Sequence, residues 1–171
     1  AQPKIRPGST DAVEALLDVG HGPVQIALKP DGGEVFVADS LSDSVSEVIT
    51  GTDDVLGAYN IGHDPVLGLV SRDNSTLYVG SLHSQWVTVY SIVDGKRVGS
   101  IHVGDGPSAM AFSAAGHLLF VVDSRSGDVA VIRTSSDHTR NTLDLSIIAA
   151  FTFLPAGRNP SAIADKAFTV K

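Results

Sequence analysis

Short apolar segments separated by turn residues recur along the chain, and they predict strands rather than helices. In the first unit a Gly-x-x-Pro turn precedes an apolar segment at residues 24–28, and a turn rich in Gly and Asp follows it. The next segment, 35–38, is apolar without alternation, which is typical of a strand buried on both faces. Ser44–Ile49 is slightly more polar, and residues 55–60 mix charged and apolar positions, as expected for an outer strand. Each unit therefore predicts four strands.

The four-strand unit repeats with a fixed period. The first three Gly-x-x-Pro turns lie 42 residues apart, and the last interval is 53. No 3.6-residue periodicity extends over 12 or more residues, so a helical solenoid is excluded. A β-sandwich gives no reason for identical turns at a constant spacing. The pattern predicts an all-β fold, a β-propeller made of four-stranded antiparallel blades. The turns begin at Gly20, Gly62, Gly104 and Gly157.

The repeat divides the chain into three complete blades flanked by partial ones. We expect a single β-propeller domain, or part of one, over residues 1–171. The predicted boundaries are 1–18 for the end of a blade, 19–60, 61–102 and 103–155 for complete blades, and 156–171 for the start of a blade.

Three segments outside the regular pattern carry further expectations. Residues 13–18 are predicted to be a fourth strand at the start of the chain. Residues 161–164 and 167–170 are predicted to supply first and second strands at its end. In the third unit, residues 146–153 are apolar enough to predict a buried fourth strand, which follows a long polar excursion at residues 134–141.

Charge and cysteine content narrow the functional classes. The formal net charge is −7, and no run of Lys or Arg interrupts it. A nucleic-acid partner is therefore excluded, because such binding requires a basic surface that displaces counterions. No apolar run approaches the roughly 20 residues needed to span a bilayer. The chain has no cysteine, which excludes disulfides, thiolate metal sites and a cysteine nucleophile.

The second strands carry a family resemblance. Their sequences are Val-Phe-Val-Ala-Asp (35–39), Leu-Tyr-Val-Gly-Ser (77–81) and Leu-Phe-Val-Val-Asp (119–123). With the Gly-x-x-Pro turns, they resemble the bacterial β-propeller repeat of about forty residues that is named for its Tyr-Val-Thr-Asn motif. The resemblance implies an exported protein, periplasmic or extracellular, related to surface-layer-like and lactonase-type propellers.

Members of that family usually have seven blades, more than this chain supplies. The interpretation that we favour is the C-terminal part of a longer propeller. Two alternatives stay open: the termini combine into one blade and close a four-bladed ring, or two chains complement each other. The open edges of an arc favour association with remaining blades or with a second copy.

Polar loops on one face of the disc form the candidate ligand-binding surface. In a propeller, the turn before each first strand and the loop between second and third strands lie on the same face. Convergent polar side chains there suit a protein or small-molecule ligand, although solvated loop residues are the simpler interpretation. The candidate residues are His21, Asp39, His63, His83, Asp105, Asp123, Arg125 and Arg158.

Metal binding and catalysis have weaker support. His21 and His63 occupy equivalent turns, and with Asp39 or His83 they have the donor types for a divalent metal. They follow the repeat rather than break it, however, so we predict no metal and no cofactor. No Gly-x-Ser-x-Gly elbow is present, and we assign no catalytic residue. Trp86 is interpreted as a packing residue at a blade edge, or else as a contact for a sugar or partner.

The sequence leads to three functional hypotheses. The first is a non-enzymatic propeller module for binding or scaffolding in an exported bacterial protein. The second is a propeller enzyme of lactonase type or a subunit of a periplasmic oxidoreductase. The third is a pure assembly element.

Overall fold

The computed structural model describes residues 13–134 and 150–164, and this part of the chain is all-β without a helix. Twelve strands form three four-stranded antiparallel sheets, here called blades 1, 2 and 3. Blade 1 contains β1 (Pro23–Leu28), β2 (Glu34–Asp39), β3 (Ser44–Ile49) and β4 (Asp54–Asn60). Blade 2 contains β5 (Pro65–Val70), β6 (Thr76–Ser81), β7 (Trp86–Ser91) and β8 (Lys96–His102). Blade 3 contains β9 (Pro107–Phe112), β10 (Leu118–Asp123), β11 (Asp128–Arg133) and β12 (Ala150–Pro155).

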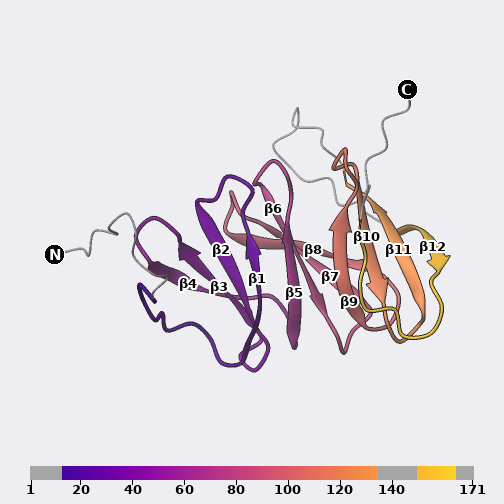
Figure 1. Ribbon diagram of the computed structural model, residues 1–171, viewed down its shortest axis with the longest axis horizontal. Coiled ribbons are helices and arrows are strands. Elements are labelled where there is room, and N and C mark those ends of the chain that lie inside the picture. Colours follow the sequence, from indigo (N-terminus) through magenta and orange to yellow (C-terminus); the bar gives the residue numbers. More distant parts are fainter. Residues whose placement is uncertain (1–12, 135–149, 165–171) are drawn as a thin grey trace.

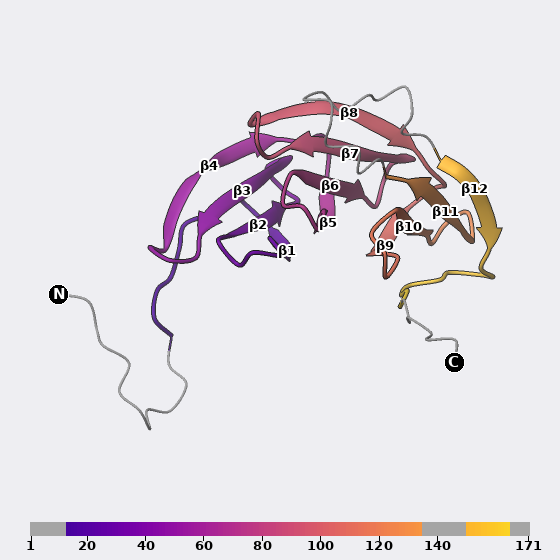
Figure 2. The ribbon, with the colours of Figure 1, turned by 90° about the horizontal axis from the view of Figure 1, so that it is seen from above.

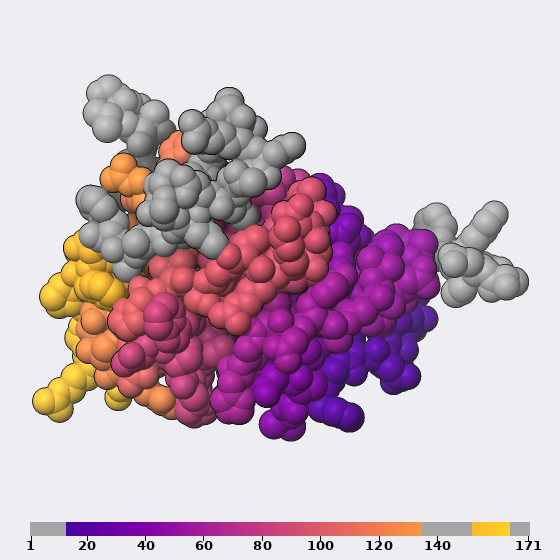
Figure 3. Space-filling view, turned by 180° about the vertical axis from the view of Figure 1, so that it is seen from behind, coloured from indigo at the N-terminus to yellow at the C-terminus, as the bar shows by residue number. Residues whose placement is uncertain are grey.

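The blades stand side by side in an arc, as Figures 1 and 2 show. Strands β1, β5 and β9 lie on the inner side of the arc, and β4, β8 and β12 lie on its outer side. Figure 3 looks onto that outer side. The predicted fold class is confirmed: the sheets have consecutive antiparallel strands and pack about a common inner side.

The core lies between neighbouring blades and explains the unbroken apolar strands. One cluster joins blades 1 and 2 and includes Phe36, Leu77 and Val79, each no more than 1% exposed. A second cluster joins blades 2 and 3 and includes Val87 and Leu119. A middle strand has a neighbouring sheet on each of its faces, so alternation is lost. All six residues of β6 are accordingly buried.

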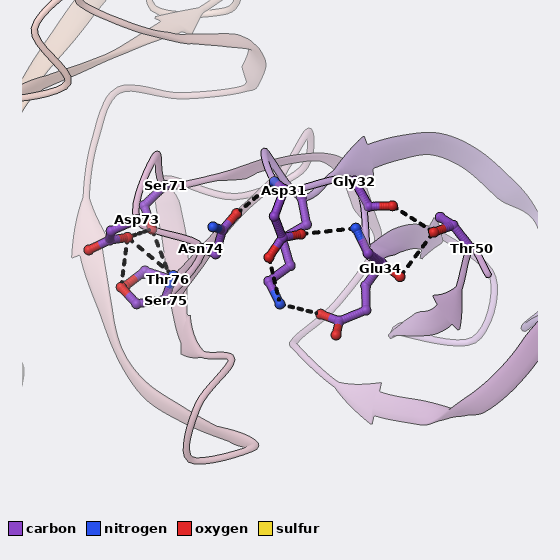
Figure 4. Close-up of polar contacts among 11 residues, drawn as sticks. Asp31, Gly32, Glu34, Thr50, Ser71, Asp73, Asn74, Ser75 and Thr76 are labelled. Atoms are coloured by element: carbon purple, nitrogen blue, oxygen red, sulfur yellow. Dashed lines mark hydrogen bonds and ion pairs between the residues drawn. The ribbon is translucent and has the colours of Figure 1, made fainter. Parts of the chain in front are cut away.

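The β1–β2 and β5–β6 turns add a polar contact between blades 1 and 2 (Figure 4). The backbone N–H of Asp31 donates to Asn74 Oδ1 at 3.1 Å, across 43 positions of sequence. Asn74 has a φ of 63°, a left-handed conformation that asparagine tolerates better than most residues. In the blade 1 turn, Lys29 Nζ lies 2.9 Å from a carboxylate oxygen of Glu34. The predicted turn residues therefore also connect the blades.

Four strand predictions need correction or cannot be assessed. Residues 13–18 and 161–164 form no strand; no described strand pairs with either segment, and a strand exists only when its backbone is paired. Residues 167–170 and 135–149, which include most of the polar excursion, lie outside the described residues. The fourth strand of blade 3 exists but spans Ala150–Pro155. It is not buried as predicted, because β12 lies on the outer side of the arc, with Phe153 43% exposed.

Candidate functional site

In each blade, the turn before the first strand lies on the same face as the loop between the second and third strands. In blade 1 the N–H of Ser40 donates to the carbonyl of Gly22 at 3.0 Å. In blade 3 the N–H of Ser124 donates to the carbonyl of Gly106 at 2.9 Å. These bonds bring together turns and loops that lie about twenty residues apart in sequence. We call this surface the loop face.

Two of the predicted site residues, Asp39 and Asp123, are fully buried beneath this face. Ser46 Oγ donates to Asp39 Oδ2 at 2.6 Å, and the N–H of Gly20 donates in turn to Ser46 Oγ at 3.1 Å. In blade 3 the N–H of Gly104 donates directly to Asp123 Oδ2 at 2.9 Å. Both aspartates therefore hold the turn against its own blade, out of contact with solvent.

Burial has a marked effect on the acidity of Asp123. Loss of solvation raises the pKa of this carboxyl to about 7, and the nearby charge of Asp128 adds to the effect. The hydrogen bond from the Gly104 amide works in the opposite direction. A carboxyl group moved out of water favours its neutral form unless enough donors compensate for the lost hydration. The carboxyl group that holds the blade 3 turn in place therefore titrates near neutral pH.

Blade 2 lacks this aspartate and holds its turn differently. Ser81 occupies the equivalent position at the end of β6. A Cβ added to Gly104 would lie 2.7 Å from Asp123 Cβ, whereas for Gly62 the nearest atom, Thr88 Oγ1, is 3.8 Å away. The Gly62 turn, where Gly62 has a φ of 129°, therefore stands farther from its own blade than the Gly20 and Gly104 turns do.

A pocket of about 390 Å³ opens at this position. Its volume falls in the range of small-molecule sites, roughly 300–1,000 Å³. Its walls come from the turn before β5, the β6–β7 loop, β7 and the outer strand β8. The pocket therefore lies toward the outer part of blade 2 rather than at the inner strands. The lining residues used below are Gly62, His63, His83, Trp86, Arg97 and Ser100.

Two of the predicted residues, His63 and His83, line this pocket together, and each is oriented by a carboxylate. His63 Nδ1 lies 3.1 Å from Asp43 Oδ1, and His83 Nδ1 lies 2.5 Å from Asp64 Oδ2. A carboxylate only accepts hydrogen bonds, so Nδ1 carries the proton and Nε2 remains for a ligand. Asp43 also accepts the N–H of Asp64 at 2.9 Å. That amide, followed by the His63 imidazole, lowers the pKa of Asp43.

The remaining predicted residues lie outside the pocket. Arg125 and Asp105 face each other at 3.8 Å, and both side chains are partly exposed. His21 is exposed, and its backbone N–H donates to Ser42 Oγ at 2.8 Å. Arg158 is exposed beyond β12. Within residues 13–134 and 150–164, no group of three or more His, Asp or Glu side chains has a metal-binding arrangement.

Arg97 and Ser100 are pocket residues that were not predicted. Both lie on β8, the outer strand, away from the loops on which the prediction concentrated. Antiparallel pairing sets Thr88 opposite Ser100 and Trp86 opposite His102, which brings the two strands to one wall. Arg97 then reaches along that wall, and its terminal nitrogen donates to Ser100 Oγ at 2.5 Å. No sequence motif marks such a strand residue as part of a site.

The similarity of this chain to known proteins is found by comparing structures and not by comparing sequences. No protein-family model matches the sequence, and no curated protein matches it. Among the described residues, no helix is long and apolar enough to cross a membrane.

Solved structures share the arc over most of its length. Hydrazine synthase of Kuenenia stuttgartiensis matches with a TM-score of 0.72 and 25% identity, over 90% of this chain and 41% of that one. The periplasmic gluconolactonase of Pseudomonas aeruginosa matches with a TM-score of 0.66 and 18% identity, over 84% and 42%. A 6-phosphogluconolactonase-like protein of Bacteroides fragilis has a TM-score of 0.72 and 14% identity, over 85% and 42%. The chain spans about two fifths of the length of each. It therefore has the β-propeller fold found in lactonase-like proteins and in hydrazine synthase.

Proposed function

We propose that this chain is a non-enzymatic binding module of an exported bacterial protein, and that a small ligand occupies the blade 2 pocket. The observation that carries the proposal is the departure of blade 2 from its own repeat. Ser81 replaces the buried aspartate of the other blades, the Gly62 turn stands farther from its own blade, and both residues line the pocket. The two histidines there have carboxylate partners on Nδ1, so each can offer Nε2 as an acceptor to a ligand.

We further propose that the arc belongs to a longer propeller of the Tyr-Val-Thr-Asn type. Ile26 and Leu28 are 61% and 60% exposed on blade 1. Their equivalents in blade 2, Gly68 and Val70, pack against blade 1, where a Cβ on Gly68 would lie 3.2 Å from Ala27 Cβ. The repeat itself thus indicates that another blade covers Ile26 and Leu28. Either further blades of the same chain or a second copy could supply it.

An export compartment, periplasmic or extracellular, is part of the same proposal. Its support is the sequence resemblance and the likeness of fold to a gluconolactonase that is itself periplasmic.

A lactonase-type enzyme is the second candidate. Two of the similar solved structures belong to gluconolactonase-like proteins. A histidine whose Nδ1 is held by a carboxylate has its Nε2 available to accept a proton from water, as general-base catalysis requires. The test is hydrolysis of D-glucono-1,5-lactone. The enzyme would be favoured over the binding module if the chain hydrolyses this lactone, if His63→Gln and His83→Gln abolish the activity, and if His21→Gln leaves it intact.

The binding proposal is tested by closing the pocket. Trp86 is the sole tryptophan of the chain and lines the pocket, so its fluorescence reports occupancy. We expect at least one compound from a panel of monosaccharides, sugar acids and amino acids to change this fluorescence saturably. Ser81→Asp should remove that response, because Ser81 lines the pocket and the larger, charged side chain would occupy part of it.

Val93→Asp is the matched control. It adds the same charge at a side chain that is 81% exposed in the β7–β8 turn, on the opposite face. It should leave the titration unchanged. No saturable response from any compound, or a response that Ser81→Asp leaves intact, would refute the proposal.

A further inference from the structure

The charge of the pocket differs from that of the chain around it. The formal net charge of the whole chain is −7. Among the described residues, those that line the pocket include one arginine and two histidines but no aspartate or glutamate. Asp43 and Asp64 stand behind the histidines and do not line the pocket themselves. An anion that enters therefore meets the Arg97 guanidinium directly, whereas an imidazole separates it from each of the two carboxylates.

Arg97 supplies the donor best suited to a planar anion. A guanidinium has five N–H groups in a rigid fork, which matches a carboxylate with two parallel hydrogen bonds. The bond from one terminal nitrogen to Ser100 Oγ fixes the end of the side chain at the pocket wall. The remaining N–H groups are sufficient for a bidentate contact. The fixed position reduces the side-chain entropy that binding would otherwise cost.

Trp86 supplies a flat apolar surface beside the guanidinium. Its side chain packs edge to face with His102, with ring centroids 4.9 Å apart. It nevertheless remains 48% exposed, which is unusual for the largest apolar side chain. Aromatic rings combine a large apolar face with a polar edge, and the C–H face of a pyranose ring is a complementary partner for such a surface.

From these contacts we infer that the pocket binds an acidic monosaccharide, a pyranose ring that carries a carboxylate. The ring lies against Trp86, the carboxylate pairs with Arg97, and the hydroxyl groups meet the Nε2 atoms of His63 and His83. This inference rests on the proposed binding function and specifies its ligand class. The charged group and the sugar face are recognised by different side chains, so they can be tested separately.

The test compares two sugars that differ in charge. D-Glucuronate carries a carboxylate, and methyl β-D-glucoside is an uncharged pyranose. Calorimetric titration should show glucuronate binding at least tenfold more tightly, because charge-assisted hydrogen bonds between a guanidinium and a carboxylate are stronger than neutral ones. Arg97→Gln should reduce the difference between the two sugars to less than about threefold. Trp86→Ala should weaken both sugars by a similar factor.

Lys96→Gln is the control for Arg97→Gln, because Lys96 is an exposed cation on the same strand that does not line the pocket. It should preserve the preference for glucuronate. Equal affinity for the two sugars, no binding of glucuronate, or an unchanged preference in Arg97→Gln would overturn the inference. If another compound still binds and Ser81→Asp abolishes its binding, the ligand class fails while the binding function stands. If Ser81→Asp has no effect on any compound that binds, the binding function fails as well.

Discussion

Asp64 orients the imidazole of His83: its Oδ2 lies 2.5 Å from His83 Nδ1, across the turn and the β6–β7 loop of blade 2. The Asp64 side chain is 22% exposed and that of His83 is 56% exposed. Because the carboxylate fixes which ring nitrogen carries the proton, it also fixes what His83 presents to the pocket. The relationship connects the path of the turn directly to the chemistry of the site.

Asp64→Asn should weaken ligand binding without unfolding the chain. Asp64 has a φ of 50°, which asparagine tolerates, but a neutral amide oxygen accepts the hydrogen bond from Nδ1–H more weakly than a carboxylate does. We expect binding of the titrated sugar to fall by roughly three- to tenfold and stability to change by less than about 1 kcal/mol, as for exposed ion pairs. Calorimetry and urea unfolding measure the two quantities. Asp54→Asn, on exposed β4, should alter neither; an Asp64→Asn protein with normal affinity would contradict the role given to Asp64.

Asp123→Asn should change the pH dependence of stability. The folded pKa of about 7 lies above the value of about 3.9 expected in the unfolded chain. Between these values the folded state binds more protons, so this group's contribution to stability is complete below pH 4 and is lost as pH rises toward 7. Asparagine does not titrate, and its amide oxygen can still accept the Gly104 N–H. Relative to the parent, the variant should therefore gain stability as pH increases through this window.

The measurement for Asp123 is urea unfolding at intervals between pH 4 and pH 8. Asp54→Asn serves as the control, because it removes an exposed carboxyl and its difference from the parent should stay nearly constant. A constant difference for Asp123→Asn as well would show that Asp123 does not titrate in this range.

Gly104→Ala should destabilise the protein, and Gly57→Ala should not. A Cβ on Gly104 would approach Asp123 Cβ to 2.7 Å, which is too close unless the turn or the buried Asp123 side chain moves. We expect a loss of about 1–3 kcal/mol, as for other overpacked sites. A Cβ on Gly57 has nothing within 4 Å, and alanine there should be neutral or stabilising by up to about 1 kcal/mol. Equal thermal stability of the two variants would argue against a tight turn in blade 3.

Asn74 has two separable roles, in backbone conformation and in the contact with blade 1. Asn74→Gly keeps the left-handed conformation but loses the acceptor for the Asp31 N–H, which should cost about 1 kcal/mol. Asn74→Ala loses the acceptor and also keeps a Cβ at positive φ without the short polar side chain that makes this conformation tolerable, which should cost about 1–2 kcal/mol more than the glycine variant. Urea unfolding separates the two contributions. If the glycine variant proves as unstable as the alanine variant, the left-handed backbone contributes little.

The loop face shows how far sequence reasoning reached for the site. The repeat correctly placed His63 and His83 on one face, because equivalent turns in a stacked structure must lie together. It could not distinguish them from Asp39 and Asp123, which share that face but are buried beneath it. A polar loop residue can face solvent or can be buried in a hydrogen bond to the turn before the first strand. Which of the two occurs depends on the path of that turn, about twenty residues away in the sequence. Arg97 was missed because its place at the pocket depends on the pairing of β7 with β8.

The sequence by itself determined the blade. A 42-residue period, turn residues at fixed offsets and middle strands without alternation together predict four-stranded blades, because each of these features follows from local backbone geometry and burial. Only the tertiary structure decided which segments found partners. Residues 13–18 have strand-like composition but no described strand to pair with, and apolar β12 lies on the outer side of the arc. The pocket is also tertiary in origin. Ser81 and Gly62 belong to different segments of the chain, and they line one pocket only because the chain folds back on itself.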